Sequence, residues 1–189
     1  RFEIFEKFIN IGKILDIGSG PGYFLKRGEE RGWVVQGIEP SKKAFQYSKE
    51  ILGLNVINKF LNDKTKSDLD IYNVIHLSEV LEHVIDPVSL LKIIYDKLSD
   101  NGLLCIVVPN EYNPFQIALR DNCGYEPWWL SPPHHINYFN FESINMLLSK
   151  NGFKVIAKES TFPIDIFLLM GQKYINNDEI GRSCHLMRK

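Results

Sequence analysis

The stretch Ile14-Leu15-Asp16-Ile17-Gly18-Ser19-Gly20-Pro21-Gly22-Tyr23 decides the fold that this sequence predicts. Its apolar first half indicates a buried strand that ends at Ile17, and a helix is expected to begin near Gly22. The glycines between them allow a sharp turn and let a ligand approach the backbone without meeting a Cβ atom. In open α/β sheets, ligands bind outside the carboxyl ends of the strands, beside the first strand. The stretch therefore predicts a ligand site at the end of a central strand.

Short apolar runs and helix-period segments alternate along the rest of the chain. The predicted strands are Lys13–Ile17, Trp33–Ile38, Leu54–Ile57, Ile71–Leu77, Leu103–Val108 and Phe153–Ile156. The predicted helices are Phe24–Arg31, Ser41–Leu52, one that Asp86 caps and that ends just before Gly102, and one that Asn140 caps and that ends at Gly152. Most of the strands lack in/out alternation, which is typical of strands buried on both faces. The order of elements predicts the α/β class, with a mostly parallel sheet and helices on both faces.

Composition and charge restrict the kind of protein. The chain has 189 residues, of which 44% are hydrophobic and 24% charged, as in an ordinary globular domain. Its formal net charge of −1 argues against a dedicated nucleic-acid binder, which usually carries a basic excess. The apolar runs are too short to cross a bilayer, so we expect no membrane span. Three cysteines without metal-ligand spacing fit a reducing compartment, and we expect a cytoplasmic protein.

We expect one domain over residues 1–189, with its core at 11–158 and a C-terminal extension at 164–189. Because the chain begins with Arg1 rather than Met, we expect it to be a piece of a longer protein. The segment Asn110–Asn140 shows no convincing periodic pattern, and its composition is that of an inserted lid. The rings in this lid that could line an acceptor pocket are Tyr112, Tyr125, Trp128 and Trp129.

The spacing of glycines and acids restricts the ligand. A dinucleotide fingerprint would place its third glycine at position 23, where this chain has Tyr23. Asp16 would repel a pyrophosphate but suits a ligand that carries a positive amine and a sulfonium. Glu39 closes the second strand, where a carboxylate can accept hydrogen bonds from both hydroxyls of a ribose. A nicotinamide-dependent oxidoreductase is therefore the disfavoured alternative.

Further motifs follow the glycine stretch in order: Gly37-Ile38-Glu39-Pro40-Ser41, Asp70–Ile75, Glu79–Pro87, Leu98–Leu104 and Leu148–Phe153. Together with Asp16-x-Gly18-x-Gly20-x-Gly22 they resemble the class I S-adenosylmethionine-dependent methyltransferases, over about residues 11–158. The nearest resemblance is to the branch that contains the ubiquinone-biosynthesis O-methyltransferases. It implies a Rossmann-like fold whose last strand is antiparallel, for which Ile164–Met170 is the candidate. It also implies S-adenosyl-L-methionine as the cofactor.

The resemblance implies a set of cofactor-binding residues. These are Asp16, Gly18, Ser19, Gly20, Gly22, Tyr23, Phe24, Glu39, Pro40, Leu61 and Ser78. In the family the first acid lies near the methionine amine, the glycines face the cofactor, and the second acid holds the ribose. Leu61 would flank the adenine, although Phe60–Asp63 departs from the commoner Gly-Asp pattern, and Ser78 would lie near the reactive end.

Histidines are the candidate general bases. His134 and His135 follow two prolines, and His135 is favoured because it aligns better with a Pro-x-His string of the family. Glu79, Glu82 and His83 have the spacing that places side chains on one face of a helical turn. That trio could hold a divalent ion, His83 could act as a base, or the three could be a polar helix start; we predict no metal.

Two other histidines are not assigned to the site. His76, inside a strand run, is interpreted as a core histidine. His185 lies in a charged tail, Gly181–Lys189, that is interpreted as mobile or as the cut edge of a missing element.

The predicted function is methyl transfer from S-adenosylmethionine to a small-molecule acceptor, with oxygen as the favoured atom. A cofactor-binding domain without catalysis is the second alternative, because binding and turnover depend on different residues. The sequence assigns neither the acceptor nor an oligomeric state.

Overall fold

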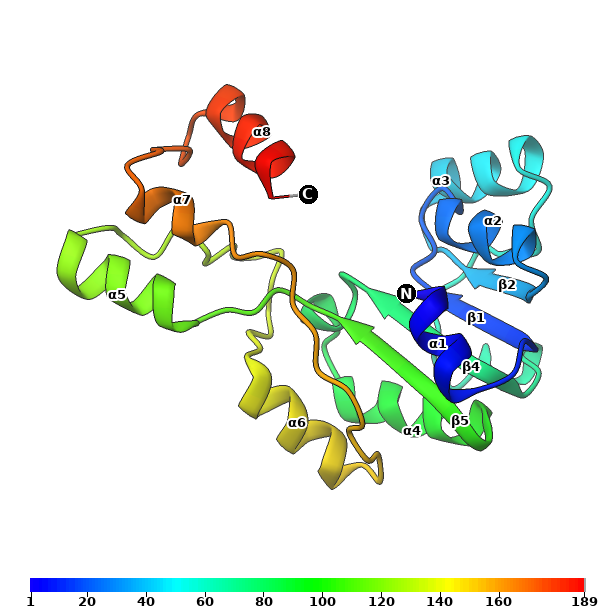
Figure 1. Ribbon diagram of the computed structural model, residues 1–189. Helices are drawn as coiled ribbons and strands as arrows, with labels where there is room; N and C mark the ends of the chain where they lie inside the picture. Colours follow the sequence, from blue (N-terminus) through cyan, green and yellow to red (C-terminus); the bar gives the residue numbers. More distant parts are fainter. Residues whose placement is uncertain (189) are drawn as a thin grey trace. The chain divides into compact units, whose positions relative to one another are not determined.

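The computed structural model describes residues 1–188 and divides into two compact units, Arg1–Val108 and Pro109–Lys189 (Figure 1). The first unit holds every strand that the described residues form, and the second unit is helical.

A five-stranded sheet forms the centre of the first unit. Its strands are β1 (Lys13–Ile17), β2 (Val34–Ile38), β3 (Val56–Ile57), β4 (Tyr72–Ser78) and β5 (Leu98–Val107). They run in the order β3-β2-β1-β4-β5, and every neighbouring pair is parallel. In β1, residues Ile14 to Ile17 are all buried, as expected of a strand covered on both faces. The predicted α/β class and parallel sheet are confirmed.

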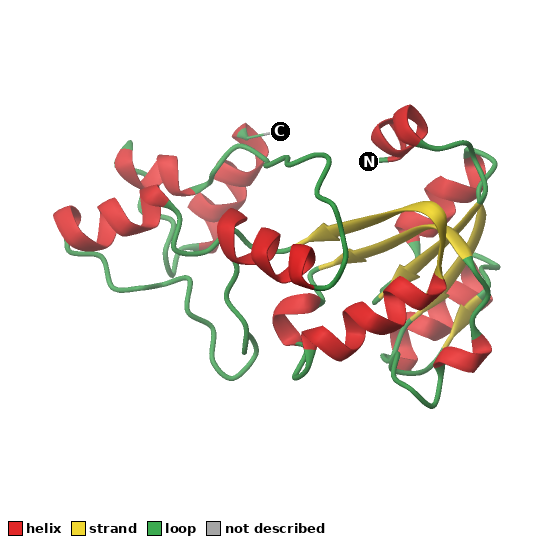
Figure 2. Cartoon of the chain, turned by 90° about the horizontal axis from the view of Figure 1, so that it is seen from below, coloured by secondary structure: helices red, strands yellow, loops and turns green. Residues whose placement is uncertain are grey.

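Helices cover both faces of this sheet. α1 (Phe2–Phe8) and α4 (Pro87–Lys97) lie on opposite faces (Figure 1, Figure 2). The other helical segments of the unit are α2 (Tyr23–Glu30), α3 (Lys42–Gln46), the π-helical turn η1 (Tyr47–Ile51), and the 3-10 turns η2 (Lys66–Asp68) and η3 (Leu81–His83). The predicted helix Ser41–Leu52 is thus α3 followed by η1. Its cap is Ser41, whose side chain accepts a hydrogen bond from the Ala44 amide at 3.4 Å.

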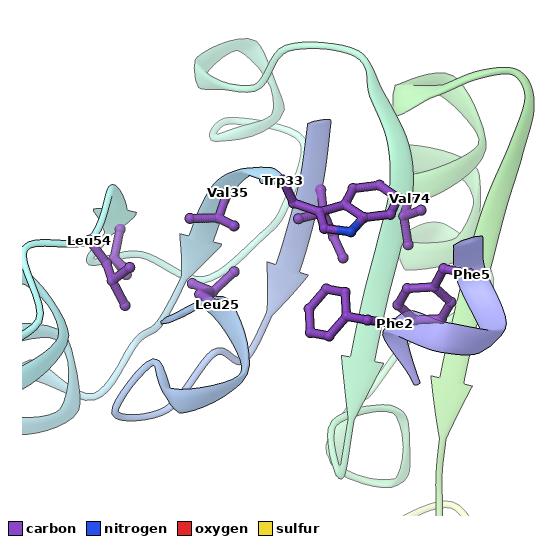
Figure 3. Packing of buried hydrophobic residues seen from close by; sticks show 9 residues of the cluster. Phe2, Phe5, Leu25, Trp33, Val35, Leu54 and Val74 are labelled. Atoms are coloured by element: carbon purple, nitrogen blue, oxygen red, sulfur yellow. The ribbon is translucent and has the colours of Figure 1, made fainter. Parts of the chain in front are cut away.

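The core of the first unit forms where α1 and α2 pack on the sheet (Figure 3). Phe2 and Phe5 of α1 are only 6% and 4% exposed, and burying each contributes about 1.5–3 kcal/mol. Gly28 of α2 permits this contact, because a Cβ atom there would lie 2.9 Å from the Phe2 ring. The buried members of this cluster are Phe2, Phe5, Ile14, Leu25, Trp33, Val35, Leu54, Val56 and Val74.

The second unit contains α5 (Pro114–Cys123), α6 (Phe141–Lys150), α7 (Asp165–Leu169) and α8 (Asp178–Met187). An asparagine precedes three of these helices and accepts hydrogen bonds from amides of the first turn: Asn113, Asn140 and Asn177. The prediction for α6 is confirmed. α5 lies inside the segment for which no periodic element was expected, and α8 replaces the mobile tail predicted at Gly181–Lys189.

Two predicted strands are wrong. Phe153–Ile156 lies in no helix or strand, and among the described residues β5 pairs only with β4. The run buries little, and Ile156 is 53% exposed. Ile164–Met170 was the candidate for an antiparallel last strand or else part of a C-terminal extension, and its residues Asp165–Leu169 form the helix α7. A short apolar run fits a strand or a helix equally well, so its pattern could not decide between them.

One predicted boundary is also wrong. The helix capped by Asp86 ends at Lys97 rather than just before Gly102, because Leu98 already begins β5. Gly102 lies inside that strand. A Cβ atom at Gly102 would lie 2.9 Å from the Ser99 carbonyl oxygen, so a close backbone contact explains this glycine. No helix within residues 1–188 has the length and apolar character that a bilayer crossing needs.

Candidate cofactor site and its chemistry

The glycine loop between β1 and α2 is built from left-handed backbone. Gly18, Gly20 and Gly22 have φ angles of 73°, 54° and 90°, a region that favours glycine. The amides of Gly18 and Ser19 both donate to the Ile38 carbonyl, at 2.8 and 3.1 Å. The loop is therefore tied to the end of β2 as well as to its own strand.

Two of these glycines differ in what surrounds them. At Gly22 a Cβ atom would lie 2.6 Å from the Leu54 side chain and 3.0 Å from Ser48. At Gly20 a Cβ atom would meet nothing within 4 Å. Gly22 is thus required by internal packing, whereas the backbone at Gly20 is open to an approaching ligand.

Glu39 closes the loop from the side of β2. Its carboxylate accepts hydrogen bonds from the Gly20 amide at 2.7 Å and from the Ser41 amide at 2.6 Å. The residue is 93% buried by its neighbours, with 7% exposed. Asn58, which sequence reasoning missed, fixes this turn by donating to the Glu39 carbonyl at 2.8 Å. The two groups that the sequence placed at separate strand ends, glycine loop and second acid, are in direct contact.

Asp16 is buried one residue before the end of β1, and 3% of it is exposed. Burial raises the pKa of its carboxyl above the ordinary value, while the hydrogen bond with His76 acts in the opposite direction. The His76 Nδ1 atom lies 2.7 Å from the Asp16 Oδ1 atom. His76 was interpreted as a satisfied core histidine, and its partner is one of the two acids of the site.

The remaining cofactor candidates lie around the same loop and the neighbouring strand ends. Tyr23 and Phe24 begin α2, and the Tyr23 hydroxyl donates to the Tyr47 hydroxyl at 3.1 Å. Pro40, Leu61 and Ser78 follow or end β2, β3 and β4. Because these strands are parallel, their carboxyl ends share one edge of the sheet with the glycine loop.

These residues fit an adenosine cofactor with a positive amine. The Ser19 Oγ atom is buried and makes no hydrogen bond, so it is a polar group that a ligand could satisfy. The open backbone at Gly20 and the buried carboxylates of Asp16 and Glu39 supply the close approach and the negative charge. Asp16 and Glu39 are the residues that would hold the amine and the ribose.

The predicted face of Glu79, Glu82 and His83 is not formed. Glu79 follows β4 with a φ angle of 57° and is exposed, whereas Glu82 in η3 is fully buried. His83 is 44% exposed at its side chain, and its Nε2 atom lies 3.9 Å from a Glu82 oxygen. The three side chains therefore do not line one helical turn, which was the premise of a metal site there.

A histidine–carboxylate pair lies in the second unit. The His135 Nδ1 atom lies 3.2 Å from the Glu111 Oε1 atom, and Glu111 is 4% exposed. The backbone brings them together, because the Glu111 amide donates to the Phe139 carbonyl at 2.8 Å. His134, the neighbouring candidate, is exposed. Sequence reasoning missed Glu111, although a carboxylate that orients an imidazole is the usual partner of a histidine base.

Residues 3–158, most of the chain, match the family of methyltransferase domains. The chain belongs to this family. The sequence resemblance to the class I S-adenosylmethionine-dependent methyltransferases is confirmed, and the Rossmann-like fold predicted with it is present.

The curated relatives that match this chain are ubiquinone biosynthesis O-methyltransferases. The ubiquinone biosynthesis O-methyltransferase of Histophilus somni is 32% identical over 102 residues, which cover 49% of this chain and 42% of that protein. The match therefore spans less than half the length of that relative.

Solved structures share the fold. A SAM-dependent methyltransferase from Archaeoglobus fulgidus has a TM-score of 0.63 at 18% identity and covers 96% of this chain and 83% of its own. The O-methyltransferase of a trans-AT PKS multienzyme of Brevibacillus brevis, solved with S-adenosyl-L-homocysteine, has a TM-score of 0.55 at 17% identity. It covers 75% of this chain and 46% of its own.

Proposed function

We propose that this methyltransferase domain transfers the methyl group of S-adenosyl-L-methionine to an oxygen atom of a small-molecule acceptor. The observation that carries the proposal is the glycine loop closed on a buried carboxylate, with the Gly20 amide 2.7 Å from Glu39. The oxygen acceptor is supported by the name of the Histophilus somni relative, and the cofactor by the ligand of the Brevibacillus brevis structure.

For methyl transfer, the main task of the protein is to position the cofactor and the acceptor relative to each other. When bound, the cofactor supplies a methyl group on a sulfonium, and the acceptor oxygen gains that methyl as the sulfur–carbon bond breaks. Holding the two reacting atoms in line provides most of the acceleration. In this chain Asp16 would hold the amine, Glu39 the ribose, and the open backbone at Gly20 would permit the close approach that fixes the cofactor.

An oxygen nucleophile must lose its proton, and we propose His135 as the base. A carboxylate beside Nδ1 makes that nitrogen the donor, so that Nε2 is the basic nitrogen. Glu111 would thus position His135 without touching the acceptor. His83 is the second candidate base and His134, whose ring is exposed, is the third.

Further properties of this protein are proposed from its sequence. The formal net charge of −1 fits a small acceptor better than a nucleic acid, whose binders usually carry a basic excess. A cytoplasmic location, the aromatic lid at 110–140 and a single domain over 1–189 stay predictions.

Isothermal titration with S-adenosylhomocysteine and with NADH tests the proposal. We expect the wild-type protein to bind S-adenosylhomocysteine and not NADH. Glu39→Ala and the size-matched Glu39→Gln should each weaken binding about 10- to 100-fold, because hydrogen bonds to a charged group are lost. Glu50→Ala, on the exposed side of η1, is the matched control and should bind as the wild type does. Tighter binding of NADH, or Glu39 variants that bind like the control, would refute the proposed cofactor site.

A further inference from the structure

His76 and Asp16 form a buried pair directly beneath the glycine loop. They are register partners on β4 and β1, and both side chains lie on the sheet face that α1 and α2 cover. The Nδ1 to Oδ1 distance is 2.7 Å, and the two residues are 1% and 3% exposed. Water therefore has little effect on the ionisation of the Asp16 carboxyl, which depends mainly on the protein groups around it.

A second contact fixes which nitrogen of His76 carries the proton. The Arg1 guanidinium Nη1 atom lies 2.9 Å from His76 Nε2. A guanidinium can only donate a hydrogen bond, so Nε2 is the acceptor. Nδ1 then carries the hydrogen and donates it to Asp16. The three residues form a directed chain, in which a neutral imidazole with one defined tautomer links a cation to a buried acid.

Aromatic stacking holds the imidazole in this orientation. The Phe24 ring lies 3.9 Å from the His76 ring at an interplanar angle of 21°. Phe24 in turn stacks on Phe2, with centroids 4.6 Å apart and an angle of 17°. Phe24 is the second residue of α2, which follows the glycine loop. The imidazole is therefore packed against the start of this helix.

The groups around Asp16 act in opposite directions on its ionisation. Burial raises the pKa of the Asp16 carboxyl, and the negative charge of Glu39 adds to that effect. The hydrogen bond from His76 and the positive charge of Arg1 lower it. From β5, Cys105 is the register partner of His76 and brings a thiol to the same row. Removing His76 would leave the positive charge of Arg1 to oppose the effects of burial and Glu39 on this pKa.

We propose that His76 is a positioning residue of the cofactor site, which keeps the Asp16 carboxylate ionised and correctly oriented for the positive amine of the cofactor. The proposal rests on the proposed role of Asp16 and adds a residue that the resemblance did not supply. His76 acts through Asp16 and need not touch the cofactor.

Three variants in the full chain test this role. His76→Leu removes both ring nitrogens, whereas His76→Asn keeps a donor near the Nδ1 position. Val74→Ala is the matched control, since Val74 lies two residues earlier on the same face of β4 and carries no polar group. Binding of S-adenosylhomocysteine is measured by calorimetry between about pH 5.5 and 8, and melting of the ligand-free protein over the same range.

We expect His76→Leu to bind about tenfold more weakly at pH 7, as after the loss of one hydrogen bond to a charged group. It should regain affinity at higher pH, because without His76 the Asp16 carboxyl holds its proton to higher pH. His76→Asn should restore most of the affinity and the wild-type pH dependence. As the pH rises, the melting temperature should fall while Asp16 loses its proton. In His76→Leu this fall should extend to a higher pH than in the wild type or in Val74→Ala. Val74→Ala should lower the melting temperature without changing either pH dependence.

An unchanged affinity in His76→Leu, or a loss that is equal at every pH and that His76→Asn does not restore, would overturn the proposal. Failure of the wild type to bind S-adenosylhomocysteine would instead refute the proposed function. The melting curves of the ligand-free protein would then still decide whether His76 keeps Asp16 ionised.

Discussion

Asp16 shows at the residue scale how a binding group can lower stability. Burial raises the pKa of its carboxyl, so the folded protein holds this proton to higher pH than the unfolded chain does. A group with a raised folded pKa contributes stability below its unfolded pKa. That stability is lost as the pH rises through the interval up to the folded pKa. At neutral pH the buried Asp16 carboxylate therefore lowers the free energy of unfolding. This is consistent with a residue whose role is to bind a ligand.

Asp16→Asn should therefore stabilise the ligand-free protein at neutral pH. We expect the melting temperature at pH 7 to rise, because the variant buries no carboxylate whose charged form burial disfavours. The gain should disappear toward pH 4, and binding of S-adenosylhomocysteine should weaken. Melting by circular dichroism from pH 4 to 8 measures the first effect, and calorimetry measures the second.

Asp70→Asn is the control with the opposite sign. Asp70 is exposed, and its hydrogen bond with Lys13 lowers the pKa of its carboxyl. That pair contributes stability above the unfolded pKa and loses it as the pH falls. Asp70→Asn should thus leave the protein slightly less stable at pH 7. A destabilised Asp16→Asn at neutral pH would contradict the assignment of Asp16 as a costly buried acid.

The sequence predicted Asp16 and Glu39 because each closes a strand beside a recognisable motif. It could not assign His76, because the contact depends on the register between β1 and β4, which no local pattern contains. Glu111 was missed for a similar reason. It meets His135 through the backbone pairing of Glu111 with Phe139, and only the folded second unit brings these segments together.

At the scale of an element, the glycine loop combines internal packing at Gly22 with an open backbone at Gly20. At Gly22 the left-handed φ angle and the neighbouring Leu54 side chain both exclude a Cβ atom. At Gly20 only the φ angle disfavours one, because the surrounding space is open. The first glycine serves the packing of the unit, and the second serves a ligand.

Alanine at these two positions should separate those roles. Gly22→Ala should lose about 2–4 kcal/mol of unfolding free energy, from backbone strain and from overpacking. Gly20→Ala should lose only about 1–2 kcal/mol, the strain of a left-handed alanine, and still bind S-adenosylhomocysteine poorly. Urea titration and calorimetry give the two quantities. Equal stability losses would show that the space around Gly20 is filled in solution.

Clear end signals did not by themselves decide which helices were predicted. α6 was found from Asn140 and Gly152, whereas α5 was missed although Asn113 and Gly124 mark its ends as clearly. The dense aromatic composition of that segment suggested a lid and hid the caps. The predicted strand Phe153–Ile156 is absent, because a short apolar run does not by itself distinguish a strand from other structure.

At the scale of the whole molecule, the candidate residues divide between the two units. Every proposed cofactor-binding residue lies in Arg1–Val108, and the favoured base lies in Pro109–Lys189 with its orienting carboxylate. Binding and turnover should therefore respond to different variants. Most of the sequence motifs lie in the first unit, whereas Glu111, which sequence reasoning missed, lies in the second.

His135→Ala should lower kcat about 10²- to 10⁴-fold, the usual contribution of a general base, and leave the affinity for S-adenosylhomocysteine within about twofold. Glu111→Gln should lower kcat less, because it weakens the orientation of the ring but keeps the base. His185→Ala, at an exposed position of α8, is the control and should change neither quantity. Loss of activity in His83→Ala but not in His135→Ala would move the base to the first unit.

The stack of Phe24 on His76 also gives the protein a built-in spectroscopic reporter. Ring currents of the phenylalanine shield the imidazole protons that lie over it, and they move those resonances upfield. Of the five histidines in the chain, His76 should therefore give imidazole signals separated from the rest in a proton NMR spectrum. Because the His76 imidazole donates to Asp16, these signals would also report whether the Asp16 carboxylate is charged. A single pH titration of the unlabelled protein would measure this.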